Sequence, residues 1–274
     1  MSTPPRTILV TGSTSGLGCE LARQYAAEPG HLILHGRNPI KLRKLVEGLS
    51  GAVARISTVE ADLADLAQVR QLADAVPTLT DSLSVLVNNA GIGQGRGNVR
   101  EESVDGLELR LAVNHLAPFA LTLSLLPLLR AGDPARVVNV ASAAQTPVDF
   151  ADPQLTARYS GSRAYAQSKF AMIATGFYLA RLLPAEEITV NSLHPATLMP
   201  TPMVAEGWGT TVDDLATGVA AVRHLIDSPT LAGVSGRYFS RQEVTDALPE
   251  AHDPEVQRHL WRLSEEWSGV RFPG

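Results

Sequence analysis

Tyr165 and Lys169, within the segment YAQSK, have the types and spacing for proton transfer. On a helix, side chains four positions apart share one face, so the Lys169 ammonium would lie beside the Tyr165 phenol. A phenol with a pKa of about 10 exchanges its proton poorly near neutral pH. An ammonium about 4 Å away, at an effective dielectric constant of about 20, would stabilise the phenolate by about 4 kcal/mol and lower this pKa by about three units. The alternative is a structural pair, with the Lys169 stem packed on a half-buried Tyr165.

Ser142 is a second candidate for chemistry. It ends the apolar segment ARVVNVAS, which has the pattern of a buried strand. Ligands of open α/β sheets bind at the carboxyl ends of the strands, so Ser142 could hold a substrate oxygen there. On its own, a serine in this position is more commonly a turn or cap residue.

A glycine-rich segment near the N-terminus predicts a phosphate-binding loop. The apolar stretch TILV runs directly into it, and the helical pattern CELARQYAA follows. Glycines let the backbone approach a pyrophosphate, and a helix N-terminus adds free N–H groups and a positive dipole end. A flexible surface loop, the alternative, fits poorly between a strand and a helix. The residues predicted to bind the dinucleotide here are Thr11, Gly12, Ser13, Ser15, Gly16, Leu17 and Gly18.

The end of the next apolar stretch, HLILHGRN, indicates which dinucleotide is bound. An Asp or Glu at this position would bond a ribose 2′-hydroxyl, and none is present. Instead Arg37 and Asn38 follow the glycine and are predicted to contact the cofactor, because an arginine can pair with a 2′-phosphate through two parallel hydrogen bonds. The sequence therefore favours NADP(H) over NAD(H). A solvated loop arginine is the alternative.

Composition excludes several other classes of protein. The chain has 274 residues, 45% hydrophobic and 19% charged, with a net charge of −5 and no Lys/Arg run, so nucleic acid is not an expected partner. A single cysteine, Cys19, excludes an internal disulfide framework and a thiolate metal cluster and fits a reducing compartment. No secretory signal or long apolar run is visible, so we expect a cytoplasmic protein that does not enter a membrane.

The elements that must position these residues alternate along the chain. Near-continuous apolar runs indicate strands buried on both faces, and helical patterns separate them, which is typical of a doubly wound parallel sheet. Strands are predicted at Thr7–Val10, His31–His35, Arg55–Glu60, Leu83–Asn88, Arg136–Ala141, Ile188–Leu193 and Arg237–Ser240. Helices are predicted at Gly18–Ala27, Ile40–Leu49, Leu66–Val76, Ser103–Arg130 with a break, Tyr159–Leu183 and Val212–Ile226, with a short capped helix in the tail.

The combination of TGxxxGxG, YxxxK and a preceding serine resembles the short-chain dehydrogenase/reductase family along almost the whole chain. This resemblance implies a single Rossmann-type α/β domain over residues 1–274, with a seven-stranded parallel sheet flanked by helices. It also implies that Asp62 and Leu63 contact the adenine. The motif NNAG, which includes Asn89, Ala90 and Gly91, would leave room for the cofactor.

The same resemblance implies a catalytic set of Asn114, Ser142, Tyr165 and Lys169, with Asn114 anchoring a water near the lysine. It further predicts cofactor contacts from Tyr165, Lys169, Pro195 and Thr197. Here the chain departs from the family pattern, because Ala196 stands in place of the usual glycine and Pro200 in place of the usual threonine. Either Thr197 or Thr201 would then contact the carboxamide. A structural hydrogen bond is the expected role of His194.

The segment between Ser142 and Tyr165, the GRN after the second strand and the tail LWRLSEEWSG resemble the retinol dehydrogenase-like and WW-domain oxidoreductase-like branch, which acts on lipophilic alcohols and carbonyls. A substrate lid is expected at about 197–220. Met199, Met203 and Trp208 could line an apolar pocket there, or could equally pack within the lid itself.

Together these features predict an NADP(H)-dependent oxidoreductase that interconverts a ketone or aldehyde and an alcohol on a medium-sized hydrophobic or polycyclic substrate. A non-catalytic NADP(H)-sensing binding protein on the same fold is the alternative. The helical segments 114–130 and 159–183 have more apolar positions than one buried face needs, so a homodimer or homotetramer is also expected.

Overall fold

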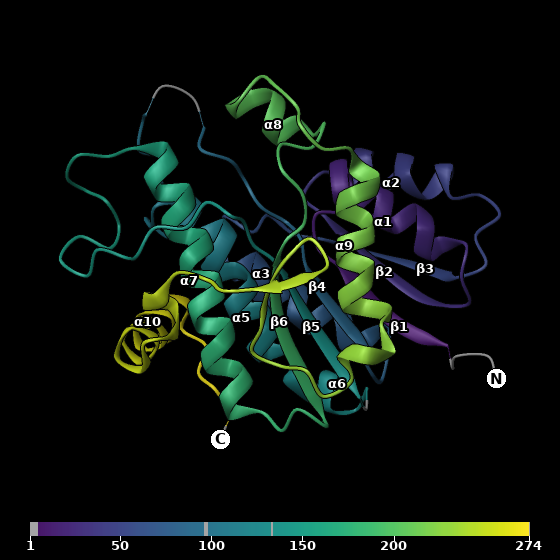
Figure 1. The fold of residues 1–274 in the computed structure, drawn as a ribbon. Coiled ribbons are helices and arrows are strands. Elements are labelled where there is room, and N and C mark those ends of the chain that lie inside the picture. The colour runs from purple at the N-terminus through teal and green to yellow at the C-terminus, as the bar shows by residue number, and fades with distance from the viewer. Residues whose placement is uncertain (1–4, 96–97, 133, 274) are drawn as a thin grey trace.

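Strands and helices alternate through most of the chain and form a three-layer α/β domain (Figure 1). The computed structural model describes residues 5–95, 98–132 and 134–273, so residues 1–4 and 274 at the ends of the predicted domain lie outside it. The strands are β1 (Arg6–Val10), β2 (Gly30–Gly36), β3 (Arg55–Glu60), β4 (Val85–Asn88), β5 (Ala135–Val140), β6 (Ile188–His194), β7 (Tyr238–Ser240) and β8 (Glu243–Thr245). In the described residues they form one sheet in the order β3-β2-β1-β4-β5-β6-β7-β8.

The seven predicted strands are confirmed as a parallel set, and the strand count is corrected by one. β8 pairs antiparallel to β7 across a turn that includes Arg241 at φ 56°. All three β8 residues are exposed. Without a buried face, this strand has no hydrophobic pattern by which the sequence could indicate it.

Ten α-helices surround the sheet in the described residues. They are α1 (Gly16–Ala26), α2 (Pro39–Gly48), α3 (Leu66–Ala75), α4 (Leu109–Leu111), α5 (Ala117–Ser124), α6 (Leu126–Arg130), α7 (Gly161–Leu182), α8 (Pro202–Gly207), α9 (Leu215–Asp227) and α10 (Pro254–Ser268). Short 3₁₀ turns lie at Val76–Thr78, Pro229–Leu231 and Pro249–His252, and a π-helical turn lies at Ala112–Leu116.

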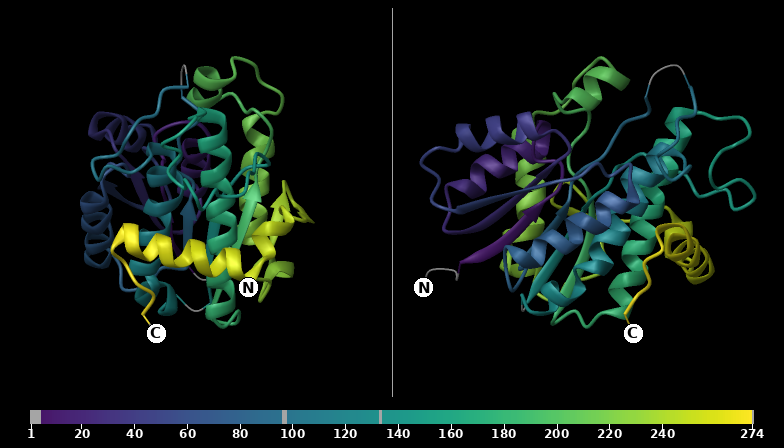
Figure 2. Two further views of the ribbon diagram at one scale, coloured as in Figure 1. Left: turned by 90° about the vertical axis from the view of Figure 1, so that its left-hand side faces the viewer. Right: turned by 180° about the vertical axis from the view of Figure 1, so that it is seen from behind.

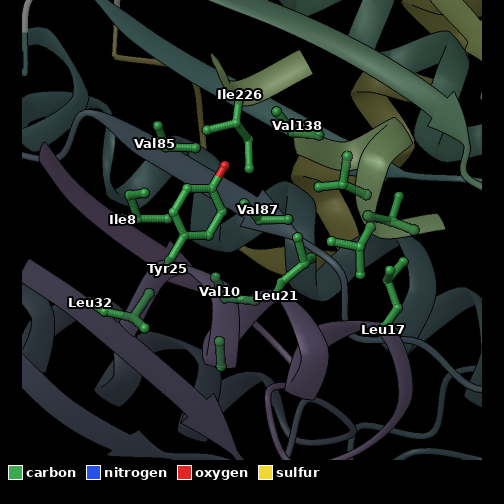
Figure 3. Close-up of a cluster of buried hydrophobic side chains, with 14 of the residues drawn as sticks. Ile8, Val10, Leu17, Leu21, Tyr25, Leu32, Val85, Val87, Val138 and Ile226 are labelled. Atoms are coloured by element: carbon green, nitrogen blue, oxygen red, sulfur yellow. The ribbon is translucent and has the colours of Figure 1, made fainter. Parts of the chain in front are cut away.

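The two faces of the sheet carry separate hydrophobic cores because side chains alternate along each strand. Ile8 and Val10 of β1 pack with α1, α2 and α9, as the close-up in Figure 3 shows for the α1 side. Leu9, between them, faces α3, α5, α6 and α7. Both faces of the sheet are thus covered by helices, and open α/β sheets of this kind bind ligands at their carboxyl edge.

The predicted helix Ser103–Arg130 begins later and is more interrupted than expected. Glu102 and Glu108 form an isolated antiparallel bridge around a turn with Gly106 at φ 75°, so the first helical residue is Leu109. The π-helical turn then follows, and the helix is interrupted again at Leu125, between α5 and α6. Such π turns are frequent at functional sites, and this one contains Asn114.

The tail forms the predicted capped helix, α10. This helix packs against α5 and α7, whose surplus apolar positions led to the oligomer prediction. α10 crosses α7 on the outside of the molecule (Figure 2). Its Trp261 packs 4.9 Å from the ring of Phe119 in α5 and 4.9 Å from Tyr178 in α7. The surplus apolar positions of α5 and α7 are therefore covered by this chain's own tail. No helix among the described residues is long and apolar enough to cross a membrane.

Candidate active site

A cavity of about 620 Å³ opens at the carboxyl edge of the sheet. Among its lining residues are most of those predicted from the sequence: Gly12, Ser15, Gly16, Leu17, Gly18, Arg37, Asn38, Asp62, Leu63, Asn89, Ala90, Gly91, Ser142, Tyr165, Lys169, Pro195, Thr197 and Thr201. These residues come from segments that are far apart in the chain. Parallel strands bring them together because all their carboxyl ends meet at one edge.

Three predicted residues do not line this cavity, and each has a structural role instead. The Thr11 hydroxyl accepts hydrogen bonds from the backbone N–H groups of Asn89 and Ala90, both at 3.0 Å, and so joins the ends of β1 and β4. The Ser13 side chain is fully buried and donates to the Val10 carbonyl at 2.7 Å. The third, Asn114, lies behind the cavity wall.

The glycine-rich loop has the shape that close approach to a phosphate requires. Gly12 has φ +68°, and a Cβ there would lie 2.8 Å from the Ala90 Cα. A Cβ on Gly18 would lie 2.4 Å from the Gly12 carbonyl oxygen. Ser15 caps α1 without a side-chain hydrogen bond, so the first N–H groups of this helix keep their capacity to bind an anion.

His35 supports this loop and was not identified from the sequence. Its Nδ1 accepts a hydrogen bond from the Gly12 N–H at 3.2 Å, and its Nε2 lies 3.0 Å from the Ala61 carbonyl. These partners define a neutral ring with the proton on Nε2, and burial lowers the pKa of His35 accordingly. A histidine inside a strand pattern gives no sign of such a role, because both of its partners come from other segments.

Two cationic side chains line the cavity near the end of β2. Arg37 is exposed, and Lys41 in the first turn of α2 also lines this end. Asn38, predicted to contact the cofactor, uses its side-chain oxygen to cap α2, accepting from Ile40 and Lys41 N–H at 3.0 Å each. The sequence did not indicate Lys41 as a cofactor contact, because the helical pattern of this segment shows only which residues are buried.

Tyr165 and Ser142 meet at the inner end of the cavity. Tyr165 is 8% exposed. Burial raises the pKa of its phenol, and a hydrogen bond with Ser142 lowers it in part. The sequence predicted a net lowering by Lys169, and the structure corrects this, because the desolvation of a buried phenolate was left out of that prediction.

Lys169 is deeply buried beside this tyrosine. Its Nζ donates to the Val140 carbonyl at 2.8 Å and lies 6.0 Å from the centroid of the Tyr165 ring. Burial lowers the pKa of Lys169 to about 8, so the amine still carries a proton at neutral pH. The predicted pair is thus present, with the ammonium held in place by the strand that leads to Ser142.

Asn114 anchors the loop that follows β4. Its Oδ1 accepts from the Ile92 N–H at 2.8 Å, and its Nδ2 donates to the Ile92 carbonyl and to the Ser168 hydroxyl, both at 3.0 Å. A Cβ on Gly91 would lie 3.1 Å from Asn114 Oδ1 and 3.4 Å from Lys169 Nζ, so the amide and the amine are separated only by this glycine. The predicted water between them stays a prediction.

The predicted lid contains the short helix α8, which Figure 1 shows beyond the carboxyl edge of the sheet. Trp208, at the end of α8, has its ring edge-on to Tyr165 with centroids 5.7 Å apart. The Gln94 side chain donates to the Gly207 carbonyl and ties this helix to the loop after β4. Trp208 therefore contacts the candidate catalytic residue as well as its own lid.

The base of the lid is held by a separate group of polar contacts. The Thr197 N–H donates to Asp213 at 2.7 Å, and Arg241 pairs with the same carboxylate at 2.9 Å. The Thr197 hydroxyl lies 3.2 Å from Nε2 of His194, which is the kind of structural hydrogen bond expected for that histidine. Thr201 caps α8 by accepting from the Val204 N–H at 3.3 Å.

Comparison with known proteins connects this geometry to a family. A family model described as short chain dehydrogenase matches residues 6–210. Retinol dehydrogenase 13 of Homo sapiens is 31% identical over 290 residues, covering 98% of this chain and 86% of that protein. The WW domain-containing oxidoreductase of Danio rerio is 31% identical over 283 residues, covering 95% of this chain and 68% of that protein.

A solved structure supports the same assignment. A short-chain dehydrogenase from Burkholderia cenocepacia in complex with NADP has a TM-score of 0.70 and 26% identity, covering 87% of this chain and 97% of that one. The three-layer α/β fold agrees with these matches. The chain belongs to the short-chain dehydrogenase/reductase family and is an NAD(P)-dependent oxidoreductase of its retinol dehydrogenase-like branch.

Proposed function

We propose that this protein interconverts a ketone or aldehyde and the corresponding alcohol with NADP(H), on a medium-sized hydrophobic or polycyclic substrate. One observation carries the proposal: Ser142, Tyr165 and Lys169 line the same cavity as Arg37 and Lys41. A candidate proton donor and two cations that could bind a phosphorylated ribose thus share one cavity.

The residues at the cavity floor fit a dinucleotide. A Cβ on Gly12, Gly16 or Gly18 would lie 2.4 to 2.9 Å from other protein atoms, so glycine keeps this loop tight, and the N-terminus of α1 would bind the diphosphate. Arg37 and Lys41 would bind the 2′-phosphate, because no acidic residue follows β2 to repel it. When bound, the reduced nicotinamide supplies the hydride that a carbonyl carbon accepts.

Tyr165 is the proton donor in this proposal. In reduction its hydroxyl proton passes to the carbonyl oxygen as the carbon receives the hydride, and in oxidation the proton returns. The buried phenol has a raised pKa, so it is protonated at neutral pH and ready for the reductive direction. Ser142 holds the substrate oxygen by a hydrogen bond, and the Lys169 ammonium stabilises the phenolate left after transfer.

The apolar lid suggests the substrate class. Met199, Met203 and Trp208 all line the cavity, and Trp208 packs against the tyrosine ring. Such a wall favours an apolar or planar ring next to the reacting carbonyl. The relative named for retinol points in the same direction.

The binding-protein alternative has no observation in its favour, because a sensor has no need for a buried acid, serine and amine around its ligand. A cytoplasmic location and a homodimer or homotetramer stay predictions. An oligomer would need a surface other than the faces of α5 and α7 that α10 covers.

The proposal is tested by following NADPH oxidation with aldehydes, ketones and quinones that carry apolar ring systems, and by repeating each assay with NADH. We expect turnover of at least one hydrophobic carbonyl, with NADPH used at lower concentration than NADH. Binding of NADPH without turnover of any carbonyl, or of any alcohol with NADP⁺, would favour the sensor alternative.

A further inference from the structure

Beyond the end of β5, the backbone carbonyl of Ser142 is bonded by side chains. The parallel ladder with β6 ends at Val140, and the last backbone bond beyond it joins the Ala141 N–H to the Leu193 carbonyl at 2.8 Å. The Ser142 carbonyl instead accepts the hydroxyl of Tyr238 at 2.9 Å. A more distant donor, Gln145 Nε2, lies 3.4 Å from the same oxygen.

Tyr238 is held firmly in position to make this bond. It lies in β7, is 4% exposed, and packs in the cluster that contains Ala141 and Phe170. Gln145, its neighbour, is itself fixed because its Oε1 accepts the Leu248 N–H at 3.1 Å. The hydrogen bond from the Tyr238 hydroxyl to the Ser142 carbonyl therefore joins β7 to the turn that contains Ser142.

The charge state of Tyr238 suits a permanent hydrogen-bond donor. Its pKa is raised to about 12, mainly by burial; a hydrogen bond with Gln145 lowers it in part, and negative charge on Tyr165 adds to the increase. Tyr238 therefore stays protonated when Tyr165 loses its proton. Tyr238 is close enough to Tyr165 for the charge of one phenol to affect the other, and its hydroxyl donates a hydrogen bond to the Ser142 carbonyl.

We propose that Tyr238 is a positioning residue for Ser142: it fixes the peptide plane of Ser142 so that the serine hydroxyl points at the Tyr165 phenol. This inference rests on the roles proposed above for Tyr165 and Ser142. Preorganised donors contribute to rate only when their direction is fixed before the reaction, and one hydrogen bond misdirected in a buried site has a measurable effect on kcat.

The test compares Tyr238→Phe with the unaltered enzyme. The ring and its packing remain, and the hydroxyl that bonds the serine carbonyl and Gln145 is lost. We expect kcat to fall by about 10-fold with the KM for NADPH unchanged, which corresponds to about 1.4 kcal/mol of transition-state stabilisation. Tyr25→Phe is the matched control, because it removes the same atom from a buried tyrosine that bonds Asp227, and its kcat should not change.

A double-mutant cycle with Ser142→Ala separates positioning from general stability. If Tyr238 acts through the serine hydroxyl, Tyr238→Phe should have no further effect on kcat in the Ser142→Ala background. Equal effects in both backgrounds, or an unchanged kcat in Tyr238→Phe alone, would overturn the inference. Absence of carbonyl turnover in the unaltered enzyme would instead overturn the proposed function on which it rests.

A second variant covers the case in which Tyr238→Phe does not fold. Gln145→Leu removes the weaker donor to the same carbonyl from a partly exposed side chain. We expect a smaller fall in kcat, again without a change in the KM for NADPH and again absent in the Ser142→Ala background. The same fall with and without the serine hydroxyl would contradict the inference.

Discussion

Two buried tyrosines, Tyr25 and Tyr165, lie at opposite edges of the sheet and have opposite surroundings. At the amino edge, the Tyr25 hydroxyl is 3.0 Å from both oxygens of Asp227. Arg6 pairs with that carboxylate at 2.8 Å, and Arg223 pairs with it at 2.9 Å while lying over the Tyr25 ring. Every charge in this group has an opposite charge beside it.

At the carboxyl edge, Tyr165 bonds a neutral hydroxyl and lies near the Lys169 ammonium, which has no ion pair within the part of the chain that the structure describes. Burial raises the pKa of both phenols, but Asp227 raises that of Tyr25 further, whereas Ser142 lowers that of Tyr165. Loss of a proton from Tyr25 would leave two anions in contact. Loss of a proton from Tyr165 would leave an anion near the Lys169 ammonium, so of these two phenols we propose Tyr165 as the acid.

The largest expected effect is on kcat, and it distinguishes Tyr165 from Tyr25 when each is replaced by phenylalanine. Tyr165→Phe should lower kcat by about 1,000-fold, within the range that general acid catalysis contributes, with little change in NADPH affinity. Tyr25→Phe should leave kcat unchanged and lower the free energy of unfolding by about 1 to 2 kcal/mol, because Asp227 loses a buried donor. Steady-state kinetics, fluorescence titration with NADPH and urea unfolding measure the three quantities. Comparable losses of activity in both variants would contradict the comparison.

Lys169→Met should lower activity but raise stability. The Lys169 pKa is lowered from 10.5 to about 8. The folded state therefore holds this proton less tightly than the unfolded state, and stability falls as pH decreases from about 10.5 toward 8. Removing the buried charge should raise the free energy of unfolding by about 1 to 3 kcal/mol at pH 7 and lower kcat by about 100-fold. Lys44→Met, on the exposed side of α2, is the control.

An unstable Lys169→Met protein would show that the amine stabilises the fold, as the paired charges at the amino edge do. The bond from its Nζ to the Val140 carbonyl would then outweigh the desolvation of the ammonium.

A smaller effect is expected for the exposed cation at the mouth of the cavity. Unlike Arg6 and Arg223, Arg37 has no ion pair among the described residues. Arg37→Ala should raise the KM for NADPH by about 10-fold and leave the KM for NADH unchanged, because the lost contact is to the 2′-phosphate. Arg43→Ala, exposed on α2 and outside the cavity lining, should change neither KM. Equal increases for both cofactors would contradict the assignment.

Local patterns predicted most of the fold and the open edge of the site. β1 to β7 and the tail helix follow from periodicity along short segments, whereas the grouping of Ser142, Tyr165 and Lys169 as a catalytic set is what the family resemblance implies. The position of the glycine-rich loop was predicted, but the orientation of its individual side chains was not. Thr11 and Ser13 turn inward, and no local signal says which residues of a loop face the cavity.

The remaining features depend on contacts between distant segments. Tyr238 bonds Ser142 across 96 positions, and His35 joins the glycine-rich loop to the end of β3, so neither role can be seen in its own segment. The surplus apolar residues of α5 and α7 were correctly noticed and wrongly explained, because sequence alone cannot say whether a partner or the chain's own tail covers them. The direction of the Tyr165 pKa was missed because the extent of burial is a tertiary property.

The central claim is that the surroundings of Tyr165, unlike those of Tyr25, permit it to release a proton. NMR titration of protein labelled with ¹³C at tyrosine Cζ, assigned with the Tyr165→Phe and Tyr25→Phe variants, measures both phenols in one sample. We predict that Tyr165 titrates at lower pH than Tyr25, which stays protonated to the end of the accessible range. Titration of Tyr25 first, or of both residues together, would contradict the account.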